Sequence, residues 1–173
     1  MKAPSLILEP LNSDASIHDR AGFTCGDAAL DQYLKTQAGQ DMRRGFANVI
    51  VAVKPGGNEL CGYYTLSAAS IDLTSLPDNL RNKLPRYGQV PAVLLGRLAV
   101  SQNLQGQGLG ALLLADAVKR SDRSELGWAV LLIKAKHEQA ASFYHRFGFQ
   151  SFTHDQLLLW ATRGELKKLT ESH

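Results

Sequence analysis

The stretch that decides the fold is Leu95–Arg120, LGRLAVSQNLQGQGLGALLLADAVKR, in which three glycines lie between an apolar segment and an amphipathic one. The apolar segment, VPAVLLGRLAV at Val90–Val100, has the composition of a strand that is buried on both faces. The segment from Gly108 to about Arg123 predicts a helix that buries Leu109, Leu112, Leu113 and Ala117 and directs Asp116, Lys119 and Arg120 to solvent. Glycines at a strand-to-helix junction let the backbone approach a ligand closely, so we expect the loop to bind a phosphate-bearing group.

Upstream of this stretch, the pattern predicts a helix and a hairpin. Asp27 is the expected N-cap of one amphipathic helix that ends at Arg44. The apolar runs at Asn48–Val53 and Leu60–Ala69 flank a turn with a Gly-Gly pair, which predicts two antiparallel strands.

Downstream, the chain continues to alternate between strand and helix. Trp128–Ala135 predicts a strand, Glu138 to about Gly148 a helix, and Phe149–Thr162 one or two more strands. No repeat or linker divides the sequence. Residues 1–173 are therefore expected to form a single domain, a mixed α/β sandwich.

Composition narrows the class of protein. Hydrophobic residues make up 45% and charged residues 20%, as in globular proteins and unlike disordered or fibrous ones. Cys25 and Cys61 are far apart and lack metal-ligand spacing, so neither a disulfide framework nor a zinc site is predicted. No segment approaches the roughly 18 apolar residues of a membrane span, and we expect a cytoplasmic protein without a membrane partner. The net charge is only +3, but clustered basic residues suit either a solvated surface or a polyanion.

Three phosphate-binding motifs compete for the glycines. A Walker loop needs Lys and then Ser or Thr after its last glycine, whereas Gly110 is followed by Ala111. The dinucleotide fingerprint is matched by Gly106, Gly108 and Ala111, but the acidic residue it requires could only be Glu125, which precedes the next strand. The third pattern, Q-x-x-G-x-G, uses Gln105, Gly108 and Gly110, so that Gly106 is a coincidental match to the dinucleotide fingerprint. In it, N–H groups at a helix N-terminus face a pyrophosphate.

This third pattern resembles the acetyl-CoA-binding motif of the GCN5-related N-acetyltransferases. The downstream stretch VLLIKAKHEQAASFYHRFGF resembles the second motif of the same family, a strand followed by a helix that ends in an aromatic-rich F-Y-x-x-F-G-F. The resemblance implies the acetyltransferase fold and acetyl-CoA as co-substrate. By position it implies that main-chain groups of Leu98, Ala99 and Val100 pair with the pantetheine arm. It also implies that a loop wraps the pyrophosphate, namely Gln105, Gly106, Gln107, Gly108, Leu109, Gly110 and Ala111.

Tyr144 matches the family tyrosine that lies near the coenzyme sulfur and protonates the departing thiolate. A phenol with a pKa of about 10 suits that role, because a thiolate is basic enough to take its proton. Without the motif, Tyr144 would be interpreted as a packing residue. A general base is harder to assign: His137 and Glu138 are candidates, but either also suits a helix start. An α-amine with a pKa of about 8 is neutral often enough to need no base.

The whole chain from about Phe23 to Phe152 resembles one branch of the superfamily, the acetyltransferase toxins of bacterial toxin–antitoxin modules. The resemblance includes FTCGDAALDQYL, LLGRLAV and FYHRFGF. It implies acetylation of the α-amino group of aminoacyl-tRNA and inhibition of translation. It further implies a homodimer, neutralisation by a ribbon-helix-helix antitoxin, and binding of operator DNA only through that antitoxin.

A charged tRNA needs a basic approach surface. The candidate residues for it are Arg43, Arg44, Arg97, Lys134, Lys136 and Arg146. Arg97 lies inside an apolar strand and could instead pair with a buried carboxylate. Two alternatives remain open: acetylation of a small amine or a protein N-terminus, and a non-catalytic module that binds acetyl-CoA. A short upstream reading frame for a ribbon-helix-helix protein would favour the toxin.

Overall fold

The computed structural model describes residues 5–171 and divides into two compact units. Unit 1 comprises residues 5–67 and 97–117, and unit 2 comprises residues 68–96 and 118–171. Two strands, β3 (Leu60–Asp72) and β4 (Gln89–Val100), and the helix α4 (Leu109–Arg123) run from one unit into the other. Among the described residues, no helix is long and apolar enough to cross a membrane.

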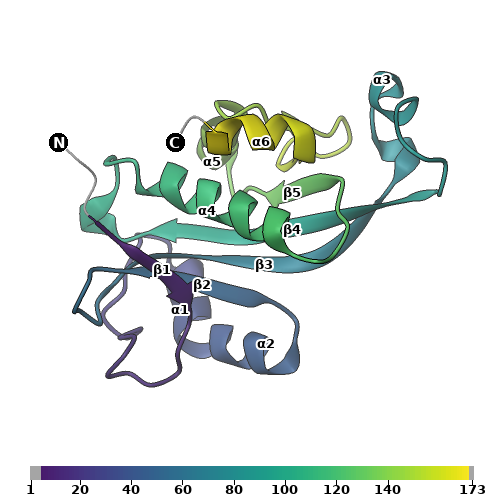
Figure 1. Ribbon diagram of the computed structural model, residues 1–173. Helices are drawn as coiled ribbons and strands as arrows, with labels where there is room; N and C mark the ends of the chain where they lie inside the picture. The colour runs from purple at the N-terminus through teal and green to yellow at the C-terminus, as the bar shows by residue number, and fades with distance from the viewer. Residues whose placement is uncertain (1–4, 172–173) are drawn as a thin grey trace. The chain divides into compact units, whose positions relative to one another are not determined.

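Unit 1 is an antiparallel sheet with helices on both faces. Its strands follow the order β1 (Ile7–Pro10), β2 (Asn48–Val53), β3 and β4. The helices α1 (Ala28–Thr36) and α2 (Ala38–Arg44) lie on one face, and the start of α4 lies on the other (Figure 1).

Two neighbouring tyrosines of β3 show how the faces of unit 1 are covered. Successive side chains of a strand point to opposite faces. The Tyr63 hydroxyl donates a hydrogen bond to the Leu30 carbonyl of α1, whereas the Tyr64 hydroxyl donates to Asp116 of α4. Next to them, Gly62 permits a close approach of β4: a Cβ at Gly62 would lie 2.8 Å from the carbonyl oxygen of Ala99.

The predicted single helix from Asp27 to Arg44 is wrong in one respect, because it is broken at Gln37. Asp27 is the N-cap, as predicted, and its side chain accepts from the N–H groups of Ala29 and Leu30. At the break, Gln37 has φ −116° and separates α1 from α2. In the residue just before the break, the Thr36 hydroxyl donates to the Gln32 carbonyl one turn back, a bond that bends helices.

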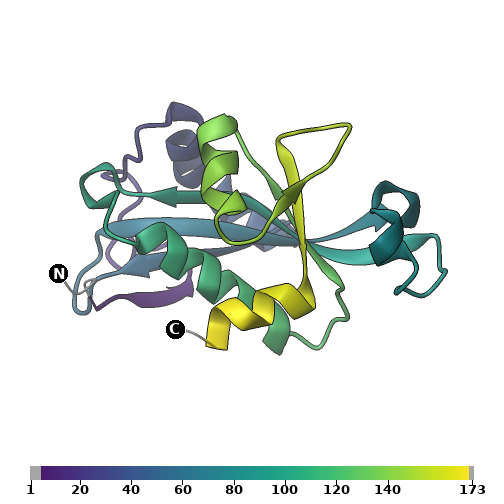
Figure 2. The same ribbon diagram turned by 90° about the horizontal axis from the view of Figure 1, so that it is seen from above.

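Unit 2 is a mixed sheet in the order β3, β4, β5 (Val130–Lys134), β7 (Leu158–Thr162) and β6 (Gln150–Ser151). β4 and β5 are parallel, whereas β5 pairs with β7 and β7 with β6 in antiparallel fashion. The helices of this unit are α3 (Asp78–Arg81), α5 (Glu138–His145) and α6 (Arg163–Glu171). Figure 2 shows α6 against the end of α4, where Arg163 Nε donates to Asp122 Oδ1 at 2.7 Å.

Several elements differ from the sequence-based expectation. β1, α3 and α6 were not predicted, and β3 extends to Asp72. β1 has four residues and α3 has four, which is too short for a clear periodicity. In α4, Leu112 is 38% exposed and Leu114 is buried instead, while Asp116 accepts the Tyr64 hydrogen bond and does not simply face solvent. A helical face drifts slowly around the axis, so spacing alone misplaces residues at its margin.

Candidate functional site

The glycine loop of unit 1 has the backbone that the sequence predicts for a phosphate-binding turn. After a 3₁₀ turn at Gln102–Leu104, Gly106 has φ +78° and Gly108 has φ +86°, both in the left-handed region. A Cβ at either position would meet no atom within 4 Å, so the space in front of the loop is open. Gly106 is more than a coincidental glycine in this turn, because its backbone conformation favours glycine as strongly as that of Gly108 does.

The loop leads directly into α4, which begins at Leu109. Leu109 is buried and anchors the helix start, while Gly110 and Ala111 in the first turn are partly buried. The first N–H groups of a helix have no acceptor within the helix, and the helix dipole is positive there. The described residues of this loop thus fit a pyrophosphate, which needs N–H donors and room for its oxygens.

Gln105 fixes the loop through its side chain rather than pointing toward a ligand. Its Nε2 donates to the carbonyl oxygen of Cys25 at 2.7 Å and to that of Val100 at 3.0 Å. These two bonds connect the loop to the segment before α1 and to the end of β4. Gln105 is therefore a positioning residue, a role that its place in the motif does not distinguish from direct binding.

The end of β4 carries the other residues that are predicted to hold the coenzyme. Its parallel pairing with β5 runs from Ala92↔Val130 to Leu95↔Ile133, and β4 then continues to Val100. Within this last segment, Ala99 is buried, whereas Leu98 and Val100 are partly buried. Their pairing with a pantetheine arm stays a prediction.

Tyr144 lies on α5 in unit 2 and is only 6% exposed. Its ring meets that of Phe149 edge to face, with centroids 6.0 Å apart, and that of Phe143 at 5.1 Å. Burial raises the pKa of the phenol well above its usual range, so the hydroxyl stays protonated at physiological pH. The phenol therefore holds its proton, although burial also makes it a weaker acid than a free phenol, and it is packed by the aromatic neighbours of the motif.

His137 is the N-cap of α5, and its Nδ1 accepts from the Ala140 N–H at 3.1 Å. The Nδ1 lone pair of His137 is thus engaged by the backbone at the start of α5. Glu138 is an exposed residue of the first helical turn. The geometry thus favours the helix-start interpretation of both residues.

The six basic residues predicted for tRNA divide equally between the units. In unit 1, Arg43 and Arg44 are exposed in the last turn of α2, and Arg97 is partly buried in β4. The other three are exposed residues of unit 2: Lys134 at the end of β5, Lys136 just after it, and Arg146 at the C-cap of α5.

Arg97 stacks on an aromatic ring. Its Cζ lies 3.5 Å from the centroid of Tyr33, within the range of a cation–π contact. The Tyr33 hydroxyl donates in turn to Asp41 Oδ2 at 2.7 Å, and burial raises the pKa of Tyr33 to about 12. Among the described residues, no ion pair joins Arg97 to a buried carboxylate: Asp41 is only partly buried, and Arg97 instead stacks on the tyrosine that donates to Asp41.

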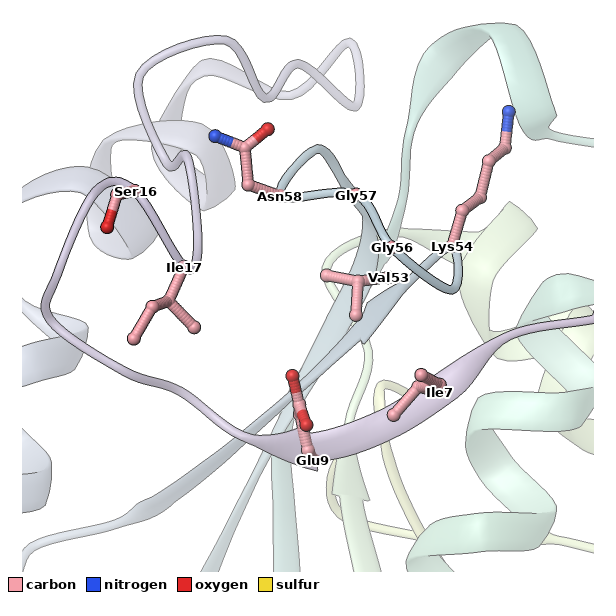
Figure 3. A pocket seen from close by; sticks show the side chains of 9 residues that line it. All are labelled: Ile7, Glu9, Ser16, Ile17, Val53, Lys54, Gly56, Gly57 and Asn58. Carbon is pink, nitrogen blue, oxygen red and sulfur yellow. The ribbon is translucent and has the colours of Figure 1, made fainter.

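A hollow of about 360 Å³ in unit 1 contains none of the predicted site residues. Figure 3 shows its lining from β1, the following loop and the hairpin turn: Ile7, Glu9, Ser16, Ile17, Val53, Lys54, Gly56, Gly57 and Asn58. Glu9 Oε1 lies 2.8 Å from Nε2 of the buried His18, whose Nδ1 accepts from the Asn12 N–H. No short sequence pattern unites these three segments, so sequence reasoning could not find the hollow.

The comparisons with known proteins agree with both motifs. Residues 46–151 match the family described as "Acetyltransferase (GNAT) domain". The chain is 34% identical over 149 residues to the tRNA-acetylating toxin of Mycobacterium tuberculosis. This match covers 85% of this chain and 86% of that protein. Among solved structures, it is similar to AtaT complexed with acetyl-methionyl-tRNAfMet, with a TM-score of 0.85, 30% identity, and coverage of 95% of this chain and 99% of that one.

A second solved structure is a tyrosine-to-phenylalanine variant of AtaT bound to the C-terminus of the antitoxin AtaR and to acetyl-CoA. Its TM-score is 0.79 at 27% identity, with coverage of 95% of this chain and 97% of that one. The family match spans more than half of the chain, and it excludes the dinucleotide interpretation of the glycine loop. The chain belongs to the GNAT acetyltransferase family.

Proposed function

We propose that this protein is the toxin of a type II toxin–antitoxin system, an N-acetyltransferase that moves an acetyl group from acetyl-CoA to the α-amino group of aminoacyl-tRNA and thereby inhibits translation. The observation that carries this proposal is the likeness over nearly the whole chain to AtaT, whose structure holds an acetylated aminoacyl-tRNA. The glycine loop at the start of α4, with its two left-handed glycines, supports the same activity because it is suited to binding the coenzyme.

In this proposal the glycine loop holds the pyrophosphate of acetyl-CoA. The N–H groups at the start of α4 supply the donors, and Gly106 and Gly108 keep the approach open. Gln105 holds the loop in shape through its bonds to Cys25 and Val100. Main-chain groups of Leu98, Ala99 and Val100 pair with the pantetheine arm as an added strand would. The coenzyme supplies the activated acetyl group as a thioester.

Tyr144 is the proposed general acid. As the α-amine forms its bond to the acetyl carbon and the carbon–sulfur bond breaks, Tyr144 donates its phenolic proton to the sulfur. The amine loses its own extra proton to water, and the Tyr144 phenolate takes a proton back from water, so the acid is restored for the next turnover. No dedicated base is needed, because an α-amine with a pKa of about 8 is partly neutral at cellular pH, and His137 is committed to capping α5.

The tRNA approaches along basic side chains in the proposed complex. Arg43, Arg44, Lys134, Lys136 and Arg146 are exposed and suited to phosphate contacts. Arg97 is less suited to contact a tRNA phosphate directly, because its guanidinium already stacks on Tyr33.

Regulation follows from the same family relationship. We propose that a small ribbon-helix-helix antitoxin encoded beside this gene neutralises the enzyme, and that operator DNA is bound only through that antitoxin. We also propose that the toxin is a homodimer and acts in the cytoplasm, where charged tRNA is found. The relative AtaT binds the C-terminus of its antitoxin AtaR, which supports a direct toxin–antitoxin contact.

The test is direct acetylation of charged tRNA. The protein is incubated with acetyl-CoA and total aminoacyl-tRNA, and the acetylated aminoacyl adenosines are identified by mass after nuclease digestion. Deacylated tRNA is the matched control, because it offers the same polyanion without an α-amine. One or a few acetylated aminoacyl species are expected. Acetylation of a polyamine or a peptide N-terminus, with none of charged tRNA, would overturn the proposal in favour of a small-amine or protein acetyltransferase.

A further inference from the structure

Two arginines from distant parts of unit 1 meet over a buried glycine of α2. The position that a Cβ on Gly39 would occupy lies 3.3 Å from Nη1 of Arg43 and 3.4 Å from Nη1 of Arg20. The hydroxyl oxygen of Ser13 lies 3.7 Å from the same point. Arg20 and Ser13 come from the loop between β1 and α1, whereas Arg43 is one turn further along the same helix as Gly39. Arg43 and Ser13 are exposed and Arg20 is partly buried, so solvent reaches the cluster.

The cluster carries two positive charges without a carboxylate to balance them. In the part of the chain that the structure describes, no ion pair involves Arg20 or Arg43. The carboxylates close in sequence to the cluster have hydrogen-bond partners of their own: Asp41 accepts from Gln37 and Tyr33, Asp14 from Ser16, and Asp19 from the Ala21 N–H. Two guanidinium groups held close together repel each other unless an anion lies between them.

The geometry fits one tetrahedral anion. Because both Nη1 atoms lie near one point, they are within about 7 Å of each other, and two N–H···O bonds of about 2.9 Å can reach different oxygens of one phosphate across that gap. Arginine is the side chain best suited to such forked contacts. The Ser13 hydroxyl supplies a third donor, and the absent side chain at Gly39 leaves the guanidinium groups room beside the helix.

We propose that Arg20, Arg43 and Ser13 form a phosphate-binding site that holds a phosphodiester of RNA. The neighbouring residues favour an RNA strand over an isolated phosphate. Arg44 adds an exposed charge, and Phe46, just beyond the C-cap Gly45, is 71% exposed. A nucleobase of RNA stacks favourably on an exposed aromatic ring that lies beside positively charged side chains. The identity of the RNA as tRNA rests on the proposed function, whereas the phosphate site does not.

The test measures binding of deacylated tRNA against salt concentration. Each phosphate contact contributes about one to the slope of log Kd against log salt. The variant R20A/R43A is expected to bind tRNA about tenfold more weakly at low salt, with the slope reduced by about one. Lys35→Ala, which removes an exposed cation of α1 in the same unit, is the matched control and should leave both values unchanged. A slope unchanged in R20A/R43A would overturn the site.

Gly39→Ala and Gly39→Leu separate a built site from a general positive field. Both keep every charge, and both place atoms where the guanidinium groups converge. We expect tRNA affinity to fall with the size of the added side chain while circular dichroism and Tm show a folded protein. Affinity unchanged in Gly39→Leu would mean that the two arginines act only through net charge, and would contradict a built site.

Three outcomes distinguish failure of the phosphate site from failure of the proposed function. If the wild-type protein acetylates no charged tRNA, but R20A/R43A still lowers the tRNA slope, the proposed function fails and the phosphate site stands. If R20A/R43A instead raises the KM for acetyl-CoA and leaves tRNA binding intact, the site holds a coenzyme phosphate and the RNA assignment is wrong. A tRNA slope unchanged alongside normal acetylation would leave the function standing and remove the site.

Discussion

The glycine loop of unit 1 and the helix α5 of unit 2 have opposite roles in the proposed reaction. In the loop, the important feature is the absence of side chains. Gly106 and Gly108 have left-handed backbones, and the space that their side chains would occupy is open. Helix α5 relies on one side chain, the phenol of Tyr144, which is buried among aromatic rings and remains protonated. A substitution should therefore act through backbone conformation in the loop and through proton donation in α5. The two effects can be measured separately as coenzyme binding and as chemical rate.

The largest effect is expected for Tyr144→Phe. This change removes the proton donor and keeps the ring that packs against Phe149. General acid catalysis contributes about 100- to 10,000-fold, so kcat for acetyl transfer should fall at least about 100-fold while the Kd for acetyl-CoA changes little. Growth inhibition should fall in parallel. Tyr87→Phe makes the same chemical change at a residue that is 83% exposed, and should leave the rate intact. Full activity in Tyr144→Phe would mean that another group protonates the sulfur.

Gly108→Ala tests whether the backbone conformation of the glycine loop is needed for coenzyme binding. A left-handed backbone costs a non-glycine residue about 1–2 kcal/mol, and the added Cβ faces the space proposed for the pyrophosphate. We expect acetyl-CoA to bind about tenfold more weakly, measured by calorimetry. Gly56→Ala is the matched control, because Gly56 has φ +77° and equally open surroundings in the β2–β3 turn. Both variants should lower Tm similarly, and only the first should weaken binding; equal coenzyme affinity in the two variants would contradict the assignment.

A smaller effect is expected for Gln105→Ala. It removes two hydrogen bonds that position the loop but no group that touches the substrate. The loss of such bonds corresponds to about a 3- to 10-fold rise in the KM for acetyl-CoA, with kcat nearly constant. Gln105→Glu should raise KM further, because it turns a carboxylate toward two carbonyl oxygens. Gln89→Ala, at an exposed residue that begins β4, serves as the control. A fall in kcat without a change in KM would argue against a positioning role.

The smallest effect concerns the pH dependence of stability near Arg97. Hydrogen bonds from Gln37 and Tyr33 hold the pKa of Asp41 below its usual range. A lowered carboxyl pKa stabilises the fold at neutral pH, and this contribution is lost as the pH falls through the folded-state pKa. Tyr33→Phe keeps the ring under Arg97 and removes one of the two bonds. Its Tm deficit should therefore be larger at pH 7 than at pH 3. The same deficit at both values would show that the Asp41 bond is not its cause.

Much of the fold could be predicted because it rests on local patterns. The Asp27 N-cap, the β2–β3 hairpin, the strand before the glycines and α4 all lie within a few residues of the expected bounds. Elements of low periodicity or little length were missed, including β1 and the polar α6. The break at Gln37 was also missed, because the apolar spacing continues across it and only the hydrogen bonds reveal it.

The sequence by itself determined the family and the chemistry. The order of glycines in QGQGLG and the tyrosine in SFYHRFGF are local features, and their spacing can be recognised directly along the sequence. Only the tertiary structure decided how individual side chains are engaged. It directs Gln105 to the carbonyls of Cys25 and Val100, stacks Arg97 on Tyr33, and brings Arg20 to Arg43 over Gly39. These contacts join residues that are far apart along the chain, and no spacing rule encodes a contact that exists only once the sheet and its helices have packed.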